Sequence, residues 1–296
     1  MTTTVGNLVT TTERHLLGTH RADRNRLATT MTDSVTSLVV EFQPGRGIGA
    51  GAYLALDDEI VYVWEYGSTS LTATIQRAQL GTTAAAHTAG AIVDINPRFP
   101  RPILRDTLKE EIDSWGPAVY QVKTLDIAVG STAQAVDLTA IGTYYSVLRV
   151  YREPRSGSDV WFNPTFRVLR NMPTADFASG TALILDGQQE AATNLRIVYS
   201  APFTTTTFTD ATDLNATVGL DASQNDIPPY GAAWRLLATR EVRRTQTQAQ
   251  GDPRNAEEVP AGFMSQTSVA LKRIRDQRLA DAAVRLSNLY PPRHDR

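Results

Sequence analysis

The stretch from Gln76 to Trp115 most constrains the fold, because its hydrophobic pattern changes there from that of strands to that of a helix. Residues 71–77 and 91–95 alternate like strands, with a glycine turn and a run of alanines between them. Prolines then end the sheet, and apolar residues recur every three or four positions until Gly116 and Pro117. A small β-domain therefore leads directly into an amphipathic helix, and this junction needs no catalytic group.

Composition narrows the class of protein. A chain of 296 residues with 42% hydrophobic and 20% charged residues is long enough for two domains with real cores. It contains no cysteine, which excludes disulfides, thiolate chemistry and cysteine-based zinc sites. No apolar run reaches the roughly 20 residues that span a bilayer, and the N-terminus lacks the pattern of a signal peptide. We therefore expect synthesis in a cytoplasm and no contact with a membrane.

The pattern along the chain predicts an α+β protein. The expected units are an N-terminal β-barrel or sandwich (1–96), a connecting amphipathic helix (97–117), an antiparallel β-sandwich (118–217) and a C-terminal helical hairpin (226–296) that contains a polar arm (245–260). In the first unit a weak helix is expected at 11–17. The strands expected there are 27–31, 35–42, 53–56, 59–66, 71–77 and 91–95.

The second half is expected to hold six further strands and two helices. The strands fall within 122–129, 135–141, 144–153, 159–170, 181–186 and 194–201. Asp226 is placed to cap a helix whose first turn contains two prolines and whose body spans 232–244. A second helix, 261–289, has a broad apolar stripe that predicts packing against the first as a hairpin.

Charge is divided unevenly along the chain. Residues 230–296 contain 12 Lys and Arg against 7 Asp and Glu, whereas the preceding residues contain 17 against 24. One interpretation is a solvated helix face paired locally, as Lys272 with Asp276 and Asp281 with Arg285 at four-residue spacing would allow. The other is a basic surface that docks onto an acidic partner. The sequence leaves both open.

The motifs do not indicate a catalytic, cofactor-binding or metal-binding residue. The glycine-rich run 45–52 is followed by a strand pattern, whereas a dinucleotide site needs a helix there. His87 is expected to be a hydrogen-bonded turn residue. Of the carboxylates Asp57, Asp58 and Glu59, two are expected to form a hairpin turn and not a calcium site. Each tryptophan lies in a predicted strand or helix, which favours a place in the core. We therefore expect no enzymatic activity.

Several stretches resemble neck, or head-to-tail connector, proteins of tailed bacteriophages, especially those of actinobacteria. The loop RAQLGTTAAAHTAGA (77–91) is similar to a phage β-module with the pattern R-G-x-x-G-T-T-A-A-A-H-x-x-G-A, in which Ala78 replaces the usual glycine. The N-terminal run NLVTTTERHLLGTHRADRNRLATTM and the C-terminal runs NDIPPYGAAWRLLATREVRR, EVPAGF and RLSNLYPPR are similar to the same family. These stretches cover roughly two thirds of the chain.

The resemblance implies a structural virion protein that forms an adaptor ring between portal and tail and lines part of the DNA conduit. Its partners would be the portal, other neck or tail proteins, identical subunits (twelve copies, by resemblance) and passing DNA without sequence-specific binding. The residues expected to dock on the portal lie at the end of the last helix: Leu286, Leu289, Tyr290, Pro291 and Arg293. Those expected at the ring interface precede the polar arm: Arg240, Arg243 and Arg244.

A minor tail, fibre or baseplate protein is the alternative, because such a protein could use the same β-module. A trimeric assembly with an exposed sugar-binding tip would favour that class. A cell-wall hydrolase is disfavoured by the scattered histidines and the lack of a G-x-S-x-G or P-loop pattern.

Overall fold

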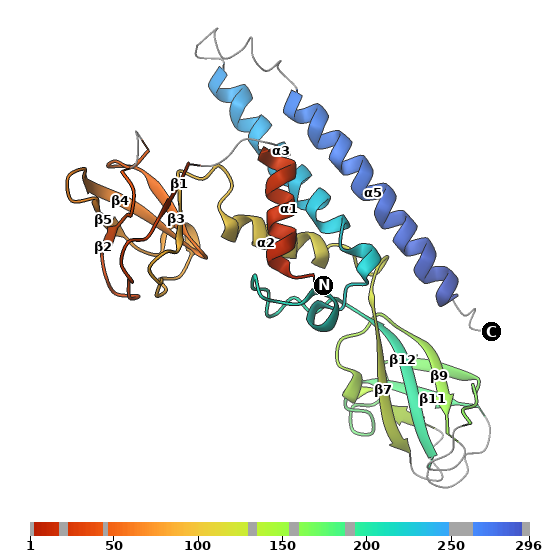
Figure 1. Cartoon of the computed structure of the whole chain (residues 1–296). Helices are drawn as coiled ribbons and strands as arrows, with labels where there is room; N and C mark the ends of the chain where they lie inside the picture. Colours follow the sequence, from red (N-terminus) through yellow and green to blue (C-terminus); the bar gives the residue numbers. More distant parts are fainter. Residues whose placement is uncertain are drawn as a thin grey trace.

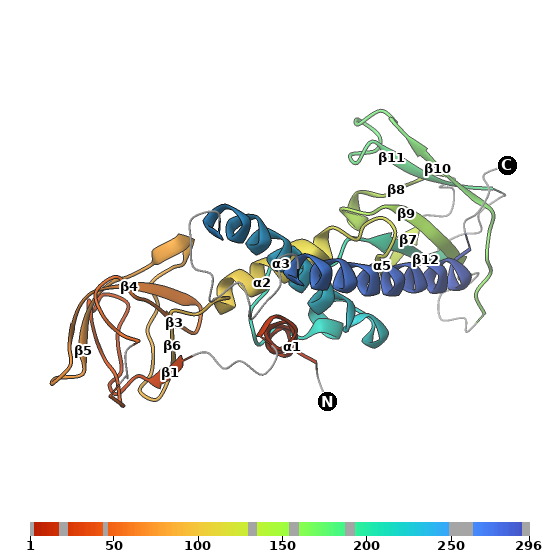
Figure 2. The same ribbon diagram turned by 90° about the horizontal axis from the view of Figure 1, so that it is seen from above.

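The computed structural model describes residues 3–17, 23–43, 47–129, 135–153, 160–186, 193–248 and 263–291. It confirms the α+β class, with helices and antiparallel sheets in one chain. A central body of helices lies between two β-domains, one formed by the N-terminal strands and the other by the middle of the chain (Figures 1 and 2). Each of the three parts has its own hydrophobic core.

The N-terminal β-domain is a curled antiparallel sheet with the strand order β1-β6-β3-β4-β5-β2. Its two edge strands approach each other, because Leu27 forms a bridge with Val40 just beyond β1 and β2. Alternating residues such as Leu54, Leu56 and Val93 face a common core inside the curl. The strands are β1 (Asp23–Arg26), β2 (Ser37–Val39), β3 (Tyr53–Leu56), β4 (Glu59–Gly67), β5 (Thr72–Gln76) and β6 (Ile92–Ile95).

Most of these strands agree with the sequence prediction, and one does not. The expected strand 27–31 is replaced by β1, which lies four residues earlier and pairs with β6. Leu27 and Met31 form only isolated bridges and place their side chains in the core. The apolar side chains that suggested a strand are therefore explained by burial in the closing loop of the curled sheet.

The helical body begins with α1 (Val5–Leu17), which is longer than the expected helix 11–17. Val5, Leu8 and Val9 are buried, so tertiary packing outweighs the low helix propensity of the threonine run. Thr10, Thr11 and Thr12 each donate their hydroxyl to the carbonyl four residues earlier. Although the expected unit 1–96 included this helix, α1 belongs to the core of the helical body.

The connecting helix is α2 (Arg101–Asp113), and it shares that core. Pro102 occupies its first turn, where a missing N–H costs nothing. Leu104, Leu108 and Ile112 are buried on one face, and Trp115 follows in the turn after the helix. Residues 97–117 are therefore part of the helical body and do not form a unit of their own.

Two long helices complete the body as the expected hairpin, α3 (Ile227–Gln248) and α5 (Phe263–Leu289). They lie side by side in Figure 1 and make the most extensive helix–helix contact among the described residues. α3 begins directly after Asp226, as expected, but it extends beyond the expected end at residue 244, and residues 245–248 of the expected arm continue it as helix. The side of α5 that contacts the shared core carries Leu279, Ala282, Ala283 and Leu286.

The second β-domain packs two three-stranded antiparallel sheets on one core, as the sandwich prediction requires. One sheet has the order β7-β12-β9 and the other β10-β11-β8. The strands are β7 (Gln121–Val129), β8 (Ala135–Asp137), β9 (Ser146–Arg152), β10 (Phe166–Arg170), β11 (Thr181–Leu185) and β12 (Thr193–Ala201). β7 and β12 continue from the helical body, where Trp115 and Phe203 meet edge to face at 5.7 Å.

Candidate functional site

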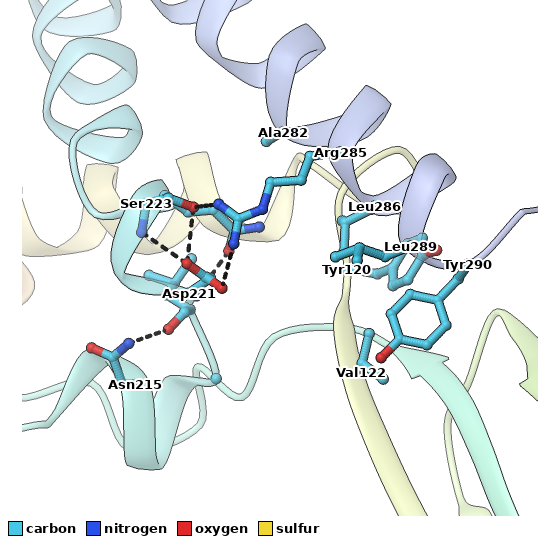
Figure 3. A pocket seen from close by; sticks show the side chains of 13 residues that line it. Tyr120, Val122, Asn215, Asp221, Ser223, Ala282, Arg285, Leu286, Leu289 and Tyr290 are labelled. Atoms are coloured by element: carbon cyan, nitrogen blue, oxygen red, sulfur yellow. Dashed lines mark hydrogen bonds and ion pairs between the residues drawn. The ribbon is translucent and has the colours of Figure 1, made fainter.

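A pocket of about 320 Å³ lies at the C-terminal end of α5, the region expected to dock on the portal (Figure 3). The start of β7 and two short helical turns, η3 (Leu214–Val218) and η4 (Ala222–Gln224), form its other walls. Tyr120, Val122 and Leu286 give it an apolar side, and Asp221 and Arg285 give it a polar side. It therefore lies where the helical body meets the second β-domain.

The polar side of this pocket is held by its own hydrogen bonds. Arg285 donates from Nη1 to Ser223 Oγ at 2.5 Å and from Nη2 to Asp221 Oδ2 at 3.2 Å. Asp221 also accepts from the backbone N–H of Ser223 at 2.9 Å, which caps η4. The backbone and hydroxyl donors of Ser223, together with Arg285, lower the pKa of Asp221. These groups therefore fix the start of η4 against α5.

The apolar side joins α5 to the second β-domain. Arg149, on β9, donates to the carbonyl of Leu289 at 2.7 Å, and its guanidinium lies 5.2 Å from the centre of the Tyr290 ring. Burial, with a smaller contribution from Tyr290, raises the pKa of Tyr120. The last turn of α5 is therefore anchored within its own chain.

Of the five residues expected to dock on the portal, two have contacts within the chain, two are exposed and one lies outside the described residues. Leu286 packs on the helical core and Tyr290 contacts β9, so both have intramolecular roles. Leu289 is 53% exposed and Pro291 is also exposed, so these two remain accessible. Arg293 lies outside the described residues.

The three arginines expected at the ring interface lie in the C-terminal part of α3. The helix includes Arg240, Arg243 and Arg244, but their side chains lie outside the part of the chain that the structure describes. Of the expected arm, 249–260 is also outside it.

Three arginines of α5 (Arg275, Arg278 and Arg285) pair with other elements, and the local pairs considered from sequence do not form. Arg275 contacts Glu111 of α2 at 2.6 Å, and Arg278 contacts Asp226 at the start of α3 at 2.7 Å. Within the described residues, neither Lys272 with Asp276 nor Asp281 with Arg285 forms an ion pair. Much of the basic charge of α5 therefore stabilises the helical body.

Glu111 is the centre of this pairing and is fully buried. It accepts hydrogen bonds from Trp115 Nε1 at 2.9 Å, Arg235 Nε at 2.8 Å and Arg275 Nε at 2.6 Å. A side chain at Gly231 would lie 2.2 Å from the Glu111 carboxyl carbon, so the glycine permits this close approach of α3. One carboxylate thus connects α2, α3 and α5.

A second buried carboxylate, Glu59, organises the loop 77–91 of the N-terminal β-domain. Arg77 donates to its two oxygens from Nε and Nη2, both at 2.6 Å. The backbone N–H groups of Ala78 and Ala85 donate to it at 3.1 Å. Despite burial, these donors, with His87, hold the pKa of Glu59 at about 2.

The remaining side chains of this loop also have structural partners. His87 lies between Asp57 Oδ2 at 2.9 Å and Glu59 Oε2 at 3.0 Å, and its backbone pairs with Met31. The hydrogen bonding expected of His87 is confirmed, although its backbone forms a β-bridge and not a turn. Asp57, at φ 46°, confirms the hairpin turn between β3 and β4. Sequence reasoning missed the burial of Glu59, because a carboxylate beside two turn aspartates is normally solvated.

The glycine-rich run and the tryptophans agree only in part with the sequence prediction. The described part of the glycine-rich run, 47–52, leads into strand β3, as expected. Trp115 lies in the core, whereas Trp64 is 60% exposed, so the expectation of a core position was wrong for Trp64. Trp161 lies 4.8 Å from the Arg196 guanidinium, and Lys272 lies 5.7 Å from the ring centre of Trp234.

Comparison with known proteins does not assign this chain to a family. No protein-family model matches the chain, and no curated protein matches it. Among the described residues, no group of three or more His, Asp or Glu side chains is arranged to hold a metal ion. In the same part of the chain, no helix has both the length and the apolar character needed to cross a membrane.

Proposed function

We propose that this chain is a structural virion protein of a tailed bacteriophage, a head-to-tail connector subunit in a ring between portal and tail. The observation that carries the proposal is the arrangement of three separately packed parts along one chain, with a β-domain at either end of the helical body (Figure 1). A ring subunit must present different surfaces to the proteins above and below it and to each neighbour. Separate domains supply such surfaces.

The chemistry of the described clusters supports a scaffolding role. Glu59, Glu111 and Asp221 each bind arginine and backbone or side-chain N–H donors that join different elements. Groups used in this way stiffen the chain, and stiffness suits a part that transmits position between portal and tail. The resemblance of 77–91 to a phage β-module adds independent support.

The proposal assigns the exposed end of α5 to portal contact. Leu289 and Pro291 are the described members of the expected docking set that remain accessible. Identical subunits, the portal and other neck proteins are the proposed partners, and the virion neck is the proposed location. Passing DNA would be contacted without sequence-specific binding.

The direct test is to locate the chain in a virion reconstruction and to measure the mass of its assembled species. Density for this fold in a ring beneath the portal would support the connector role. A trimer at the tail tip would instead assign the chain to the fibre or baseplate class. Peptidoglycan, nucleotide and nuclease turnover by the purified protein, lost on changing His87, would contradict a structural role.

A further inference from the structure

The face of α5 that points away from α3 is exposed along most of its length. Among the helices and strands that the structure describes, none lies beside this face in Figure 1. Gln277 lies at its centre, directly opposite the side that packs on the helical body, and the positions three, four and seven residues to either side of Gln277 are all exposed. We call this surface the outer stripe of α5. It extends over about 21 Å of helix at 1.5 Å per residue.

The outer stripe carries two charged residues that have no ion-pair partner among the described residues. Arg273 lies four residues before Gln277, and Asp281 lies four residues after it. They are about 12 Å apart along the helix, too far for a direct contact within one chain. Their neighbours Arg275, Arg278 and Arg285 are all paired with other elements.

These positions are related by symmetry about Gln277. If a second copy of α5 is laid antiparallel across the first, with a two-fold axis at Gln277, Arg273 of each copy lies opposite Asp281 of the other. Two opposite-charge pairs then form at once. The two Gln277 side chains meet on the axis, where an amide can both donate and accept.

The apolar positions of the stripe obey the same symmetry. Ala270 falls opposite Val284, so the larger side chain meets a small one, whereas Ile274 and Ala280 lie on the two flanks of the contact. Ile274 is 43% exposed and Val284 is 60% exposed, which leaves apolar area for a partner to cover. A shallow groove lined by residues of α5, including Ala270, Arg273 and Ile274, accompanies the first half of the stripe.

We propose that the outer stripe of α5 is an interface at which two copies of this chain associate as an antiparallel, two-fold symmetric dimer. The charged pair Arg273 and Asp281, the apolar pair Ala270 and Val284 and the amide of Gln277 each match the same surface of a second copy. We therefore identify a second copy of this chain as the partner. A single helix pair of this length lies at the small end of specific interfaces, so the dimer is weak and depends on concentration. The proposal concerns free subunits and does not rest on the connector role.

Charge reversal tests the pairing. Across about 1 to 300 µM, sedimentation velocity of the wild type should show a monomer–dimer equilibrium, and R273D or D281R should weaken it about tenfold by placing like charges opposite each other. The double variant R273D/D281R restores opposite charges in both pairs and should recover dimerisation. E110R is the matched control, because Glu110 is exposed on α2 and should leave the equilibrium unchanged.

A cysteine placed on the proposed axis gives a second readout. The chain has no cysteine, so Q277C would introduce a single thiol that can reach only its own copy in the partner. Oxidation should give a disulfide-linked dimer, whereas E110C should remain monomeric. A wild type that stays monomeric throughout, a double variant that fails to recover dimers while its circular dichroism is native, or Q277C that does not cross-link would each overturn the proposal.

Discussion

At the scale of single residues, the buried carboxylates Glu59 and Glu111 have the largest consequences. Removing a charge from water is expensive unless hydrogen bonds and an opposite charge replace the lost solvation. Glu59 receives these from Arg77 and the loop backbone, and Glu111 receives them from Arg235 and Arg275. Both carboxylates therefore fix the position of segments that are distant in sequence.

We expect E59Q to destabilise the N-terminal β-domain by about 3 kcal/mol, because it leaves the buried Arg77 guanidinium without its counter-charge. Amide hydrogen exchange over residues 53–95 measures this change locally. D58N is the control, since Asp58 is half exposed and pairs with Arg105 at the surface, and it should cost less than about 1 kcal/mol. Equal losses in the two variants would contradict the assigned role of Glu59.

The low pKa of Glu59 also predicts a dependence on pH. Its pKa is lowered from 4.5 to about 2 in the folded chain, so the unfolded chain takes up the proton first as pH falls. The stabilisation by Glu59 is then fully present above about pH 4.5 and is lost between about pH 4.5 and 2. His87 contacts both Glu59 and Asp57, so E59Q is the comparison that isolates the contribution of Glu59. Stability of the variant should fall less steeply over this window, and parallel curves would refute the prediction.

At the scale of elements, the loop 77–91 shows how backbone conformation accounts for a sequence pattern. Ala78 has φ 55° and ψ 46°, the left-handed region that favours glycine, and Gly81 and Gly90 also have positive φ. The resembling phage pattern has glycine at the position of Ala78. The departure of this chain from that pattern therefore places a strained alanine in a loop that Glu59 holds in place.

A78G should relieve this strain and stabilise the N-terminal β-domain by about 1 kcal/mol, net of the larger entropy of the unfolded glycine chain. Thermal unfolding measured by circular dichroism tests the change. A85G is the matched control, because Ala85 does not have positive φ, and it should destabilise by about 0.5 to 1 kcal/mol. If A78G is less stable than wild type, strain at this position is not significant.

The end of α5 gives a prediction about truncation. Deleting residues 288–296 should leave a folded protein, because Leu289 is half exposed and its carbonyl and the Tyr290 ring interact mainly with Arg149. We expect a cost of about 1 kcal/mol by denaturant titration. Under the proposed function, heads carrying the truncated protein should fail to join tails or should leak DNA, and normal tail joining would exclude this end from portal contact.

At the scale of the whole molecule, three cores are linked by surface ion pairs and shared aromatic contacts. Arg24 connects the N-terminal β-domain to Glu13 of α1, and Arg105 connects α2 to Asp58. Arg149 of β9 connects the second β-domain to Leu289 and Tyr290 at the end of α5. Such links allow each part to keep its own surface for assembly.

Assembly gives the last prediction. Changing Arg240, Arg243 and Arg244 together to glutamate should reduce ring formation on purified portal, because these residues are proposed to meet acidic groups of an adjacent copy. Each exposed pair contributes only about 0 to 1 kcal/mol, but the contributions sum around a ring. Circular dichroism and melting should stay nearly unchanged, and portal-bound rings are counted by electron microscopy. Normal assembly of the variant would assign the arginines to a solvated helix face.

Local patterns in the sequence were enough to predict the class, the strands β3 and β4 and the extent of α5, because alternation, turns and three-to-four spacing act between near neighbours. They also indicated that His87 is hydrogen-bonded and that the last helix ends at Leu289. These features depend on only a few consecutive residues.

Only the tertiary structure decided the extent of α1, the burial of Glu59 and Glu111, and the partners of the basic residues of α5. Each depends on residues far apart in the chain: Arg275 and Glu111 are 164 positions apart, and Arg77 and Glu59 are 18 apart. A threonine-rich segment becomes helical because other helices cover it, and a carboxylate becomes buried because a distant arginine reaches it. Long-range packing sets both outcomes.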